Sequence, residues 1–133
     1  MTAAVHNVTF DAKNPYELAL FWSAVLGLPL EDEAEPGHDE VYLAAPHGSP
    51  GFLFIRVPEG KGAKNRVHLD LTHDTTRDGE VARILALGAA IVQDHRRPDG
   101  TGWAYMADPE GNEFCVERNA AERAATGDGP HSD

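Results

Sequence analysis

The sequence has a single cysteine, Cys115, among its 133 residues. One cysteine cannot form an internal disulfide, which fits a reducing compartment, and a chain of this length can bury an ordinary core without covalent cross-links. The sequence also lacks an apolar run approaching the ~20 residues of a membrane-spanning helix. Its N-terminus lacks the basic start and apolar stretch of a signal peptide. We therefore expect a soluble, cytoplasmic protein without a membrane partner.

Basic residues are scarce. The 11 Lys and Arg residues stand against 22 Asp and Glu residues, so the formal net charge is -11 and the isoelectric point is near 4.9. This balance argues against nucleic acids and anionic membranes as partners. The small basic groups at residues 61–66 and 96–97 are too sparse to reverse it. The sequence also lacks a nucleophile elbow, a phosphate-binding glycine loop and a Cys-x-x-Cys pair, so none of these motifs assigns a reaction.

What the sequence contains instead is a repeat with a period of roughly sixty residues. Residues 5–10 read Val-His-Asn-Val-Thr-Phe, and residues 67–72 read Val-His-Leu-Asp-Leu-Thr. A helical stretch that ends in Leu-Gly follows each segment, and each half then closes with a turn and a strand-like run. One supersecondary unit used twice should bring matched positions together around a pseudo-twofold axis. This alignment matches His6 with His68.

The pattern of each half predicts a strand, a helix and three further strands. Asn14-Pro15 marks the start of the first helix and Gly27 its left-handed end. Residues 58–65, rich in Gly and Lys, form the boundary between the halves. Two such modules give an α+β architecture with helices on the convex face of a curved sheet. The predicted strands cover residues 5–10, 40–45, 52–57, 67–72, 89–93, 103–107 and 113–117, and the predicted helices cover 14–27 and 77–87.

Four groups of residues give the chain a family resemblance. They are Phe21-Trp22 ahead of Leu26-Gly27-Leu28, residues 64–71, residues 86–89, and the turn and strand at 108–115. Together they resemble the vicinal oxygen chelate superfamily, the glyoxalase, bleomycin-resistance and dioxygenase fold, and within it the glyoxalase-like domain branch without an assigned reaction. The resemblance implies paired βαβββ modules that form a curved mixed sheet around a central cavity, and commonly a homodimer.

The expected domain organisation follows from the repeat and the resemblance. A single glyoxalase-like domain covers residues 1–118, with modules at about 4–58 and 66–118. Residues 119–133 have lost the repeat pattern and carry no apolar side chain larger than Ala. We expect this tail to fray or to be disordered.

The resemblance also implies metal-ligand positions on the first and last strand of each module, usually His, Glu, His and Glu. His6 and His68 match the two first-strand positions. Cys115 falls at the last-strand position of the second module, and the matching position of the first falls among residues 53–55, which are Leu, Phe and Ile. Hard and borderline divalent cations need charged oxygen to offset their desolvation. The sequence therefore predicts that the usual four-ligand site is lost and that no cofactor is bound.

Cys115 keeps a second interpretation open. As a thiolate it could replace part of the missing charge, and His6, His68 and Cys115 with a water would form a known catalytic zinc pattern. Glu113 and Glu117 share the strand face of Cys115 and could reach inward. Zinc, nickel, iron and manganese are the cations of this alternative. The other interpretation of Cys115 is a small buried hydrophobe, its commonest role.

Three functional hypotheses follow. The first is a metal-independent protein that binds a small organic molecule in the cavity between the modules. The second is a divalent-metal-dependent lyase, isomerase or dioxygenase that uses His6 and His68. The third is a metal-free enzyme in which His68, oriented by Asp70, is the acid or base. The histidines could equally be satisfied core or rim residues, and Trp103 could pack within its own hairpin. In the first hypothesis the cavity is lined by His6, Phe54, His68, Trp103 and Cys115.

Overall fold

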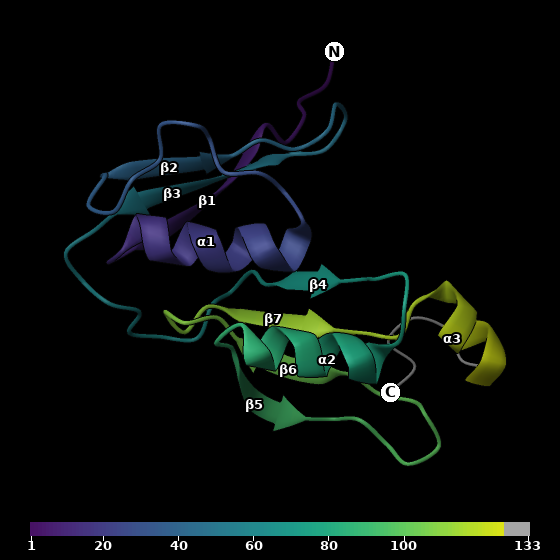
Figure 1. Ribbon diagram of the computed structural model, residues 1–133. Coiled ribbons are helices and arrows are strands. Elements are labelled where there is room, and N and C mark those ends of the chain that lie inside the picture. The colour runs from purple at the N-terminus through teal and green to yellow at the C-terminus, as the bar shows by residue number, and fades with distance from the viewer. Residues whose placement is uncertain (127–133) are drawn as a thin grey trace. The chain divides into compact units, whose positions relative to one another are not determined.

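The computed structural model describes residues 1–126, which form a mixed α+β protein with two sheets and three helices (Figure 1). The predicted α+β fold class is confirmed. The chain divides into two compact units, Met1–Lys61 and Gly62–Asp133, and the division falls inside the predicted connector at residues 58–65. Within the described residues, no helix has the length and apolar character needed to cross a bilayer.

The first unit is a three-stranded sheet with one helix. In chain order it contains β1 (Asn7–Ala12), α1 (Pro15–Leu26), β2 (Glu40–Leu43) and β3 (Gly51–Arg56). The strands lie in the order β1-β3-β2, with β1 parallel and β2 antiparallel to β3. Where the repeat predicts a further strand after the helix, the structure has a single bridge between Leu30 and Leu43. Pro29 has no N–H to donate, so a longer ladder is not favoured there.

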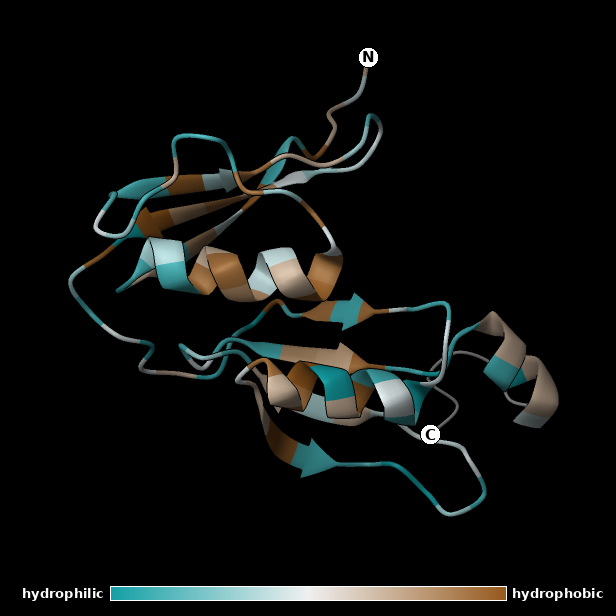
Figure 2. Ribbon diagram, viewed as in Figure 1, coloured by the Kyte–Doolittle hydropathy of each residue, from teal (hydrophilic) through white to brown (hydrophobic). Residues whose placement is uncertain are grey.

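α1 covers one face of this sheet because its apolar stripe meets alternate residues of β1 and β3. The ring centroid of Phe10 lies 5.5 Å from that of Trp22 on α1 and 5.1 Å from that of Phe54 on β3. Phe54 is fully buried. Figure 2 shows the apolar residues gathered along β3 and on α1. The structure thus places Phe54 in the core beneath α1 and not at a cavity wall, because its position in the strand alternation faces the helix.

The second unit has a four-stranded sheet and two helices. In chain order it contains β4 (Leu69–Leu71), α2 (Arg77–Ala86), β5 (Ala90–Asp94), β6 (Ala104–Ala107), β7 (Glu113–Val116) and α3 (Ala120–Thr126). The strands lie in the order β4-β7-β6-β5, with β4 parallel to β7 and the other neighbours antiparallel. Val81 and Ile84 of α2 are buried together with alternate residues of β6 and β7, which form the core of this unit.

A helix, α3, occupies the first part of the segment for which the sequence predicts disorder. Asn119 Oδ1 accepts the N–H of Glu122 at 2.9 Å, and Glu122 Oε1 accepts the N–H of Asn119 at 3.1 Å. These two bonds form the reciprocal capping box of a helix N-terminus. The disorder prediction is wrong for residues 119–126 because polar caps, and not apolar side chains, hold this helix. The rest of the predicted tail, residues 127–133, lies outside the described residues.

Candidate functional site

The face of the second sheet that points away from α2 carries polar side chains. Alternation along β7 places Phe114 and Val116 in the core and turns Cys115 to the other face. Cys115 stands opposite Asp70 on β4 and opposite Tyr105 on β6. Three neighbouring strands therefore bring a carboxylate, a thiol and a phenol into one row. We call this surface the polar face, and its residues are His68, Asp70, Tyr105, Glu113, Cys115 and Glu117.

His68 completes the centre of the polar face. Its Nε2 lies 3.4 Å from Asp70 Oδ1, and the two side chains are 37% and 38% exposed. Ligand-type atoms of His68, Asp70 and Cys115 all lie within 4.8 Å of one another. The imidazole stands edge-on to the ring of Tyr105, with the centroids 6.1 Å apart. A molecule or cation at this point would meet nitrogen, oxygen and sulfur donors together.

The thiol of Cys115 is held in its protonated form. Burial, the charges of Asp70 and Glu117, and a hydrogen bond to the Asp70 carboxylate raise the pKa of Cys115 to about 12. Lys64 opposes this only weakly, as the last of the causes. A thiol with so high a pKa is a poor nucleophile at neutral pH. Cys115 therefore acts as a hydrogen-bond donor to Asp70 unless a cation displaces its proton.

A lysine reaches the polar face from the segment that precedes β4. Lys64 Nζ donates to Tyr105 Oη at 2.9 Å and lies 5.2 Å from the centroid of the same ring. The hydrogen bond to Tyr105 raises the pKa of Lys64 above its ordinary value. The next residue anchors this segment, because the N–H of Asn65 donates to Glu113 Oε2 at 3.0 Å. The ammonium group is thereby kept beside the phenol.

The ladders show that His6 and His68 are not equivalent positions. In the first unit the even-numbered residues of β1 face the helix, as Phe10 does, and the Gly51 N–H donates to His6 O within the same ladder. In the second unit the even-numbered residues His68 and Asp70 lie on the face away from the helix. A shift of one residue reverses the face of every side chain. The positions of the first unit that correspond to His68 and Cys115 in the ladder are Asn7 and Leu53.

The structure places the candidate site residues of the sequence in different surroundings. His68 and Cys115 lie close together on the polar face. His6 is an exposed residue just before β1, and Phe54 is a core residue; both belong to the first unit. The ring of Trp103 stacks on that of His95 at 4.6 Å, so its contacts are those of hairpin packing.

Two residues of the site, Tyr105 and Lys64, are absent from the sequence predictions, and Asp70 was expected only as an orienting group. The signal for Tyr105 lay in the hairpin around residues 108–112. A turn closed by Ala107 and Glu113 places Tyr105 opposite Cys115. The contact of Lys64 with Tyr105 joins residues 41 positions apart and depends on how the connector folds back, which carries no sequence pattern.

A separate hollow of about 360 Å³ lies in the first unit, lined by residues of β2, β3 and the segment after β3. Its one basic side chain, Arg56, donates through Nε to Asp39 Oδ1 at 3.1 Å and through Nη1 to Lys13 O at 2.5 Å. The guanidinium is therefore already occupied. This hollow offers a weaker site than the polar face.

Residues 7–117 match the family described as the glyoxalase-like domain. No curated protein matches the chain.

Solved structures share the fold. A glyoxalase/bleomycin resistance protein/dioxygenase family enzyme from Burkholderia phytofirmans PsJN is 20% identical, with a TM-score of 0.66 over 86% of this chain and 97% of that one. A lactoylglutathione lyase from Agrobacterium tumefaciens is 21% identical, with a TM-score of 0.57 over 87% and 93%. A fosfomycin resistance protein from Listeria monocytogenes, in complex with Mn(II) and 1S,2S-dihydroxypropylphosphonic acid, is 16% identical, with a TM-score of 0.66 over 92% and 96%. At these identities the similarity concerns the fold alone.

Proposed function

Because the chain belongs to the glyoxalase-like domain family, we propose that it binds a small organic molecule on the polar face of its second unit, with His68 as the acid–base group. The observation that carries this proposal is the convergence of His68, Asp70 and Cys115 within 4.8 Å, beside the phenol of Tyr105. A sheet face that needed only to be solvated would not require a buried thiol and a carboxylate in register.

The acid–base role of His68 follows from its neighbours. Histidine is the side chain that exchanges a proton most readily near neutral pH. The Asp70 carboxylate beside Nε2 favours the tautomer with the proton on Nε2. Nδ1 is then the nitrogen that accepts a proton from a bound molecule. Asp70 thus orients the imidazole, and His68 is the group that touches the ligand.

The charges of the polar face indicate the class of ligand. Three carboxylates, those of Asp70, Glu113 and Glu117, share the face, and Lys64 places one ammonium group against it. An anionic ligand would meet more negative than positive charge. Tyr105 and Lys64 supply O–H and N–H donors at one side. We therefore propose a neutral or cationic organic molecule with a carbonyl or hydroxyl oxygen.

A divalent cation at the same residues is the second candidate, and Asp70 is the observation that favours it. The donor set of His68, Asp70 and Cys115 fits zinc, which binds nitrogen, oxygen and sulfur ligands in three-residue catalytic sites. It fits manganese less well, because manganese prefers oxygen-rich sites. The carboxylate and a thiolate would offset the charge of the cation. When bound, zinc would polarise a ligand oxygen as a Lewis acid.

Metal analysis of protein purified without a His tag separates the two candidates. Stoichiometric zinc that is lost in His68→Ala and Asp70→Ala, and retained in His47→Ala, would favour the metal centre. His47 is a matched control because it lies exposed in a turn of the first unit. Metal-free protein would favour the organic ligand bound without a metal.

A thermal-shift screen tests the organic ligand directly. A panel of neutral and cationic planar compounds is added to metal-free protein, since a ligand that binds only the folded state raises the melting temperature. We expect a shift that weakens in His68→Ala and Tyr105→Phe and persists in His47→Ala. A shift unaffected by both changes at the polar face would place the ligand elsewhere and overturn the proposal.

A further inference from the structure

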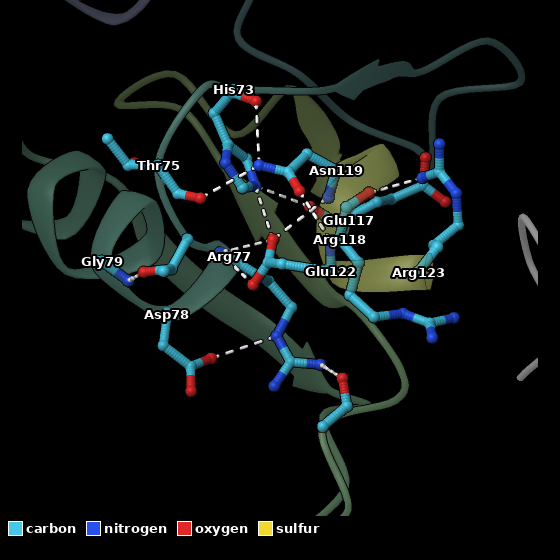
Figure 3. Close-up of polar contacts among 12 residues, drawn as sticks. His73, Thr75, Arg77, Asp78, Gly79, Glu117, Arg118, Asn119, Glu122 and Arg123 are labelled. Carbon is cyan, nitrogen blue, oxygen red and sulfur yellow. Dashed lines mark hydrogen bonds and ion pairs between the residues drawn. The ribbon is translucent and has the colours of Figure 1, made fainter. Parts of the chain in front are cut away.

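Glu122 on α3 caps two helices at once. Its Oε1 and Oε2 both accept the backbone N–H of Arg77, the first residue of α2, at 3.0 Å. Its Oε1 also accepts the N–H of Asn119, at the start of α3. Figure 3 shows the carboxylate between the two chain segments. A carboxylate at a helix N-terminus satisfies backbone N–H groups that lack partners within the helix. One side chain therefore joins the C-terminal helix to the beginning of α2.

Asn119 holds the loop that leads from β4 into α2. Its Nδ2 donates to the carbonyl oxygens of His73 at 3.2 Å and Thr75 at 3.0 Å (Figure 3). These carbonyls belong to residues 72–76, the loop between β4 and α2. Both donors of the amide point at the loop, while its Oδ1 caps α3.

His73 is buried beneath the same contacts. Its side chain is 3% exposed, and its Nε2 lies 2.8 Å from Glu117 O and 3.6 Å from Glu122 Oε1. Its Nδ1 is buried and has no partner within the described part of the chain. Nε2 therefore carries the proton and donates to Glu117 O, at the end of β7. The loop after β4 is thus tied to both β7 and α3.

These contacts bear on the polar face through β4. This strand spans three residues and lies at the edge of its sheet, where β7 is its one neighbour among the described strands. Its ladder ends where the Glu117 N–H donates to Leu71 O at 3.3 Å. So short an edge strand depends on what holds its ends. Its middle residue is Asp70, which stands opposite Cys115.

α3 is held in place by polar contacts. Among the described residues it buries no side chain of its own. Arg118 Nη1 donates to Thr126 Oγ1 at 2.6 Å, and Arg123 Nη1 donates to Arg118 O at 2.5 Å. Removing one polar contact would therefore loosen the helix without opening an apolar core.

We propose that Asn119 and Glu122 are positioning residues for the polar face: by holding residues 72–76 they keep β4 in register with β7 and Asp70 against Cys115. The proposal rests on the function proposed for this face, but its geometry is testable without a ligand. Neither residue touches a bound molecule; both act through the loop and β4.

The chain offers a direct reporter, because Cys115 is its one cysteine. The rate at which a thiol reagent such as 5,5′-dithiobis(2-nitrobenzoate) modifies Cys115 in metal-free, full-length protein measures how often β4 and β7 open locally. Each of Asn119→Ala and Glu122→Ala removes three side-chain hydrogen bonds, and we expect each to raise this rate about 10-fold or more. Glu33→Ala, in an exposed turn of the first unit, is the matched control and should leave it unchanged.

Asn119→Asp separates positioning from helix capping. An aspartate keeps the oxygen that caps α3 but loses both donors to His73 O and Thr75 O. We expect the thiol of Asn119→Asp to react as fast as that of Asn119→Ala. Amide hydrogen exchange should also become faster over residues 69–76 in both variants and stay unchanged in β5 and β6. A wild-type rate in Asn119→Asp would leave only a capping role and overturn the proposal. So would faster exchange spread evenly over both units. If the expected pattern appears while no ligand binds the polar face, only the proposed function fails.

Discussion

Asp70 and Cys115 stand opposite each other in the parallel ladder between β4 and β7, and the Asp70 carboxylate accepts a hydrogen bond from the Cys115 thiol. A carboxylate in this position keeps the thiol protonated and orients His68 on its other side. The same two groups become a pair of anionic ligands if a cation displaces the thiol proton. The chemistry of the polar face therefore depends on this one pair.

Alkylation of Cys115 in the metal-free native protein should be slow at neutral pH. With a pKa of about 12 the thiolate fraction at pH 8 is about 10⁻⁴, against about 10⁻¹ for the unfolded chain with its pKa near 9. We expect iodoacetamide to react about 1,000-fold more slowly in native protein than in urea. Equal rates in the two conditions would contradict the proposed environment of Cys115.

The raised pKa of Cys115 also predicts how the stability of the protein depends on pH. The folded state keeps the thiol proton up to a pKa of about 12, whereas the unfolded state loses it near 9. The contribution of Cys115 to the free energy of unfolding is therefore fully present below pH 9 and is lost as pH rises from 9 toward 12. Urea unfolding at pH 8 and pH 10 measures this. The wild type and Cys115→Ala should differ less in their free energy of unfolding at pH 10 than at pH 8.

Asp70→Asn should make Cys115 more reactive. The change removes a negative charge and a charged hydrogen-bond acceptor beside the thiol, while burial continues to raise the pKa. If the pKa of Cys115 falls by about one, the thiolate fraction at pH 8 rises about 10-fold, and alkylation speeds up by the same factor. Asp74→Asn, an exposed residue of the next loop, is the control and should react as wild type does. Identical rates in both variants would mean that Asp70 does not act on the thiol.

Phe54→Ala should reduce the free energy of unfolding by about 3–5 kcal/mol, the cost of an emptied aromatic position in a core. Phe54 is fully buried and packs against Phe10. Leu53→Ala, on the other face of the same strand and half-buried, should cost less. Urea unfolding measures both. A small loss for Phe54→Ala would place this side chain outside the core.

Gly102→Ala should destabilise the hairpin between β5 and β6. Gly102 has a φ of 89°, and a Cβ there would lie 1.9 Å from the carbonyl oxygen of His95. Strain of this backbone conformation together with the clash should cost about 2 kcal/mol or more. Gly62→Ala, where a Cβ meets open space, should cost far less. Equal melting temperatures for Gly102→Ala and Gly62→Ala would contradict the expected strain.

Much of the fold was predictable because its signals are local. Short stretches of sequence indicate the start of α1 at Pro15 and its end at the left-handed Gly27. The turn at Asp108 likewise indicates the strands on either side of it. The helix α3 was also accessible, since Asn119 and Glu122 have capping-box spacing. The prediction failed there because it weighed only apolar side chains.

The sequence by itself determined the repeat, the order of the strands and of the helix within residues 67–117, the family, and the places of His68 and Cys115 at the first and last strands of the second unit. Only the tertiary structure decided which of those residues face one another. Side chains alternate between the two faces of a strand. The alternation groups His6 with the residues that face α1 and His68 with the residues that face away from α2, although the two histidines align in sequence. Asp70 and Tyr105 lie opposite Cys115 on the neighbouring strands, and Lys64 reaches Tyr105 from the connector. Pairing between segments so distant in the chain leaves no local sequence pattern.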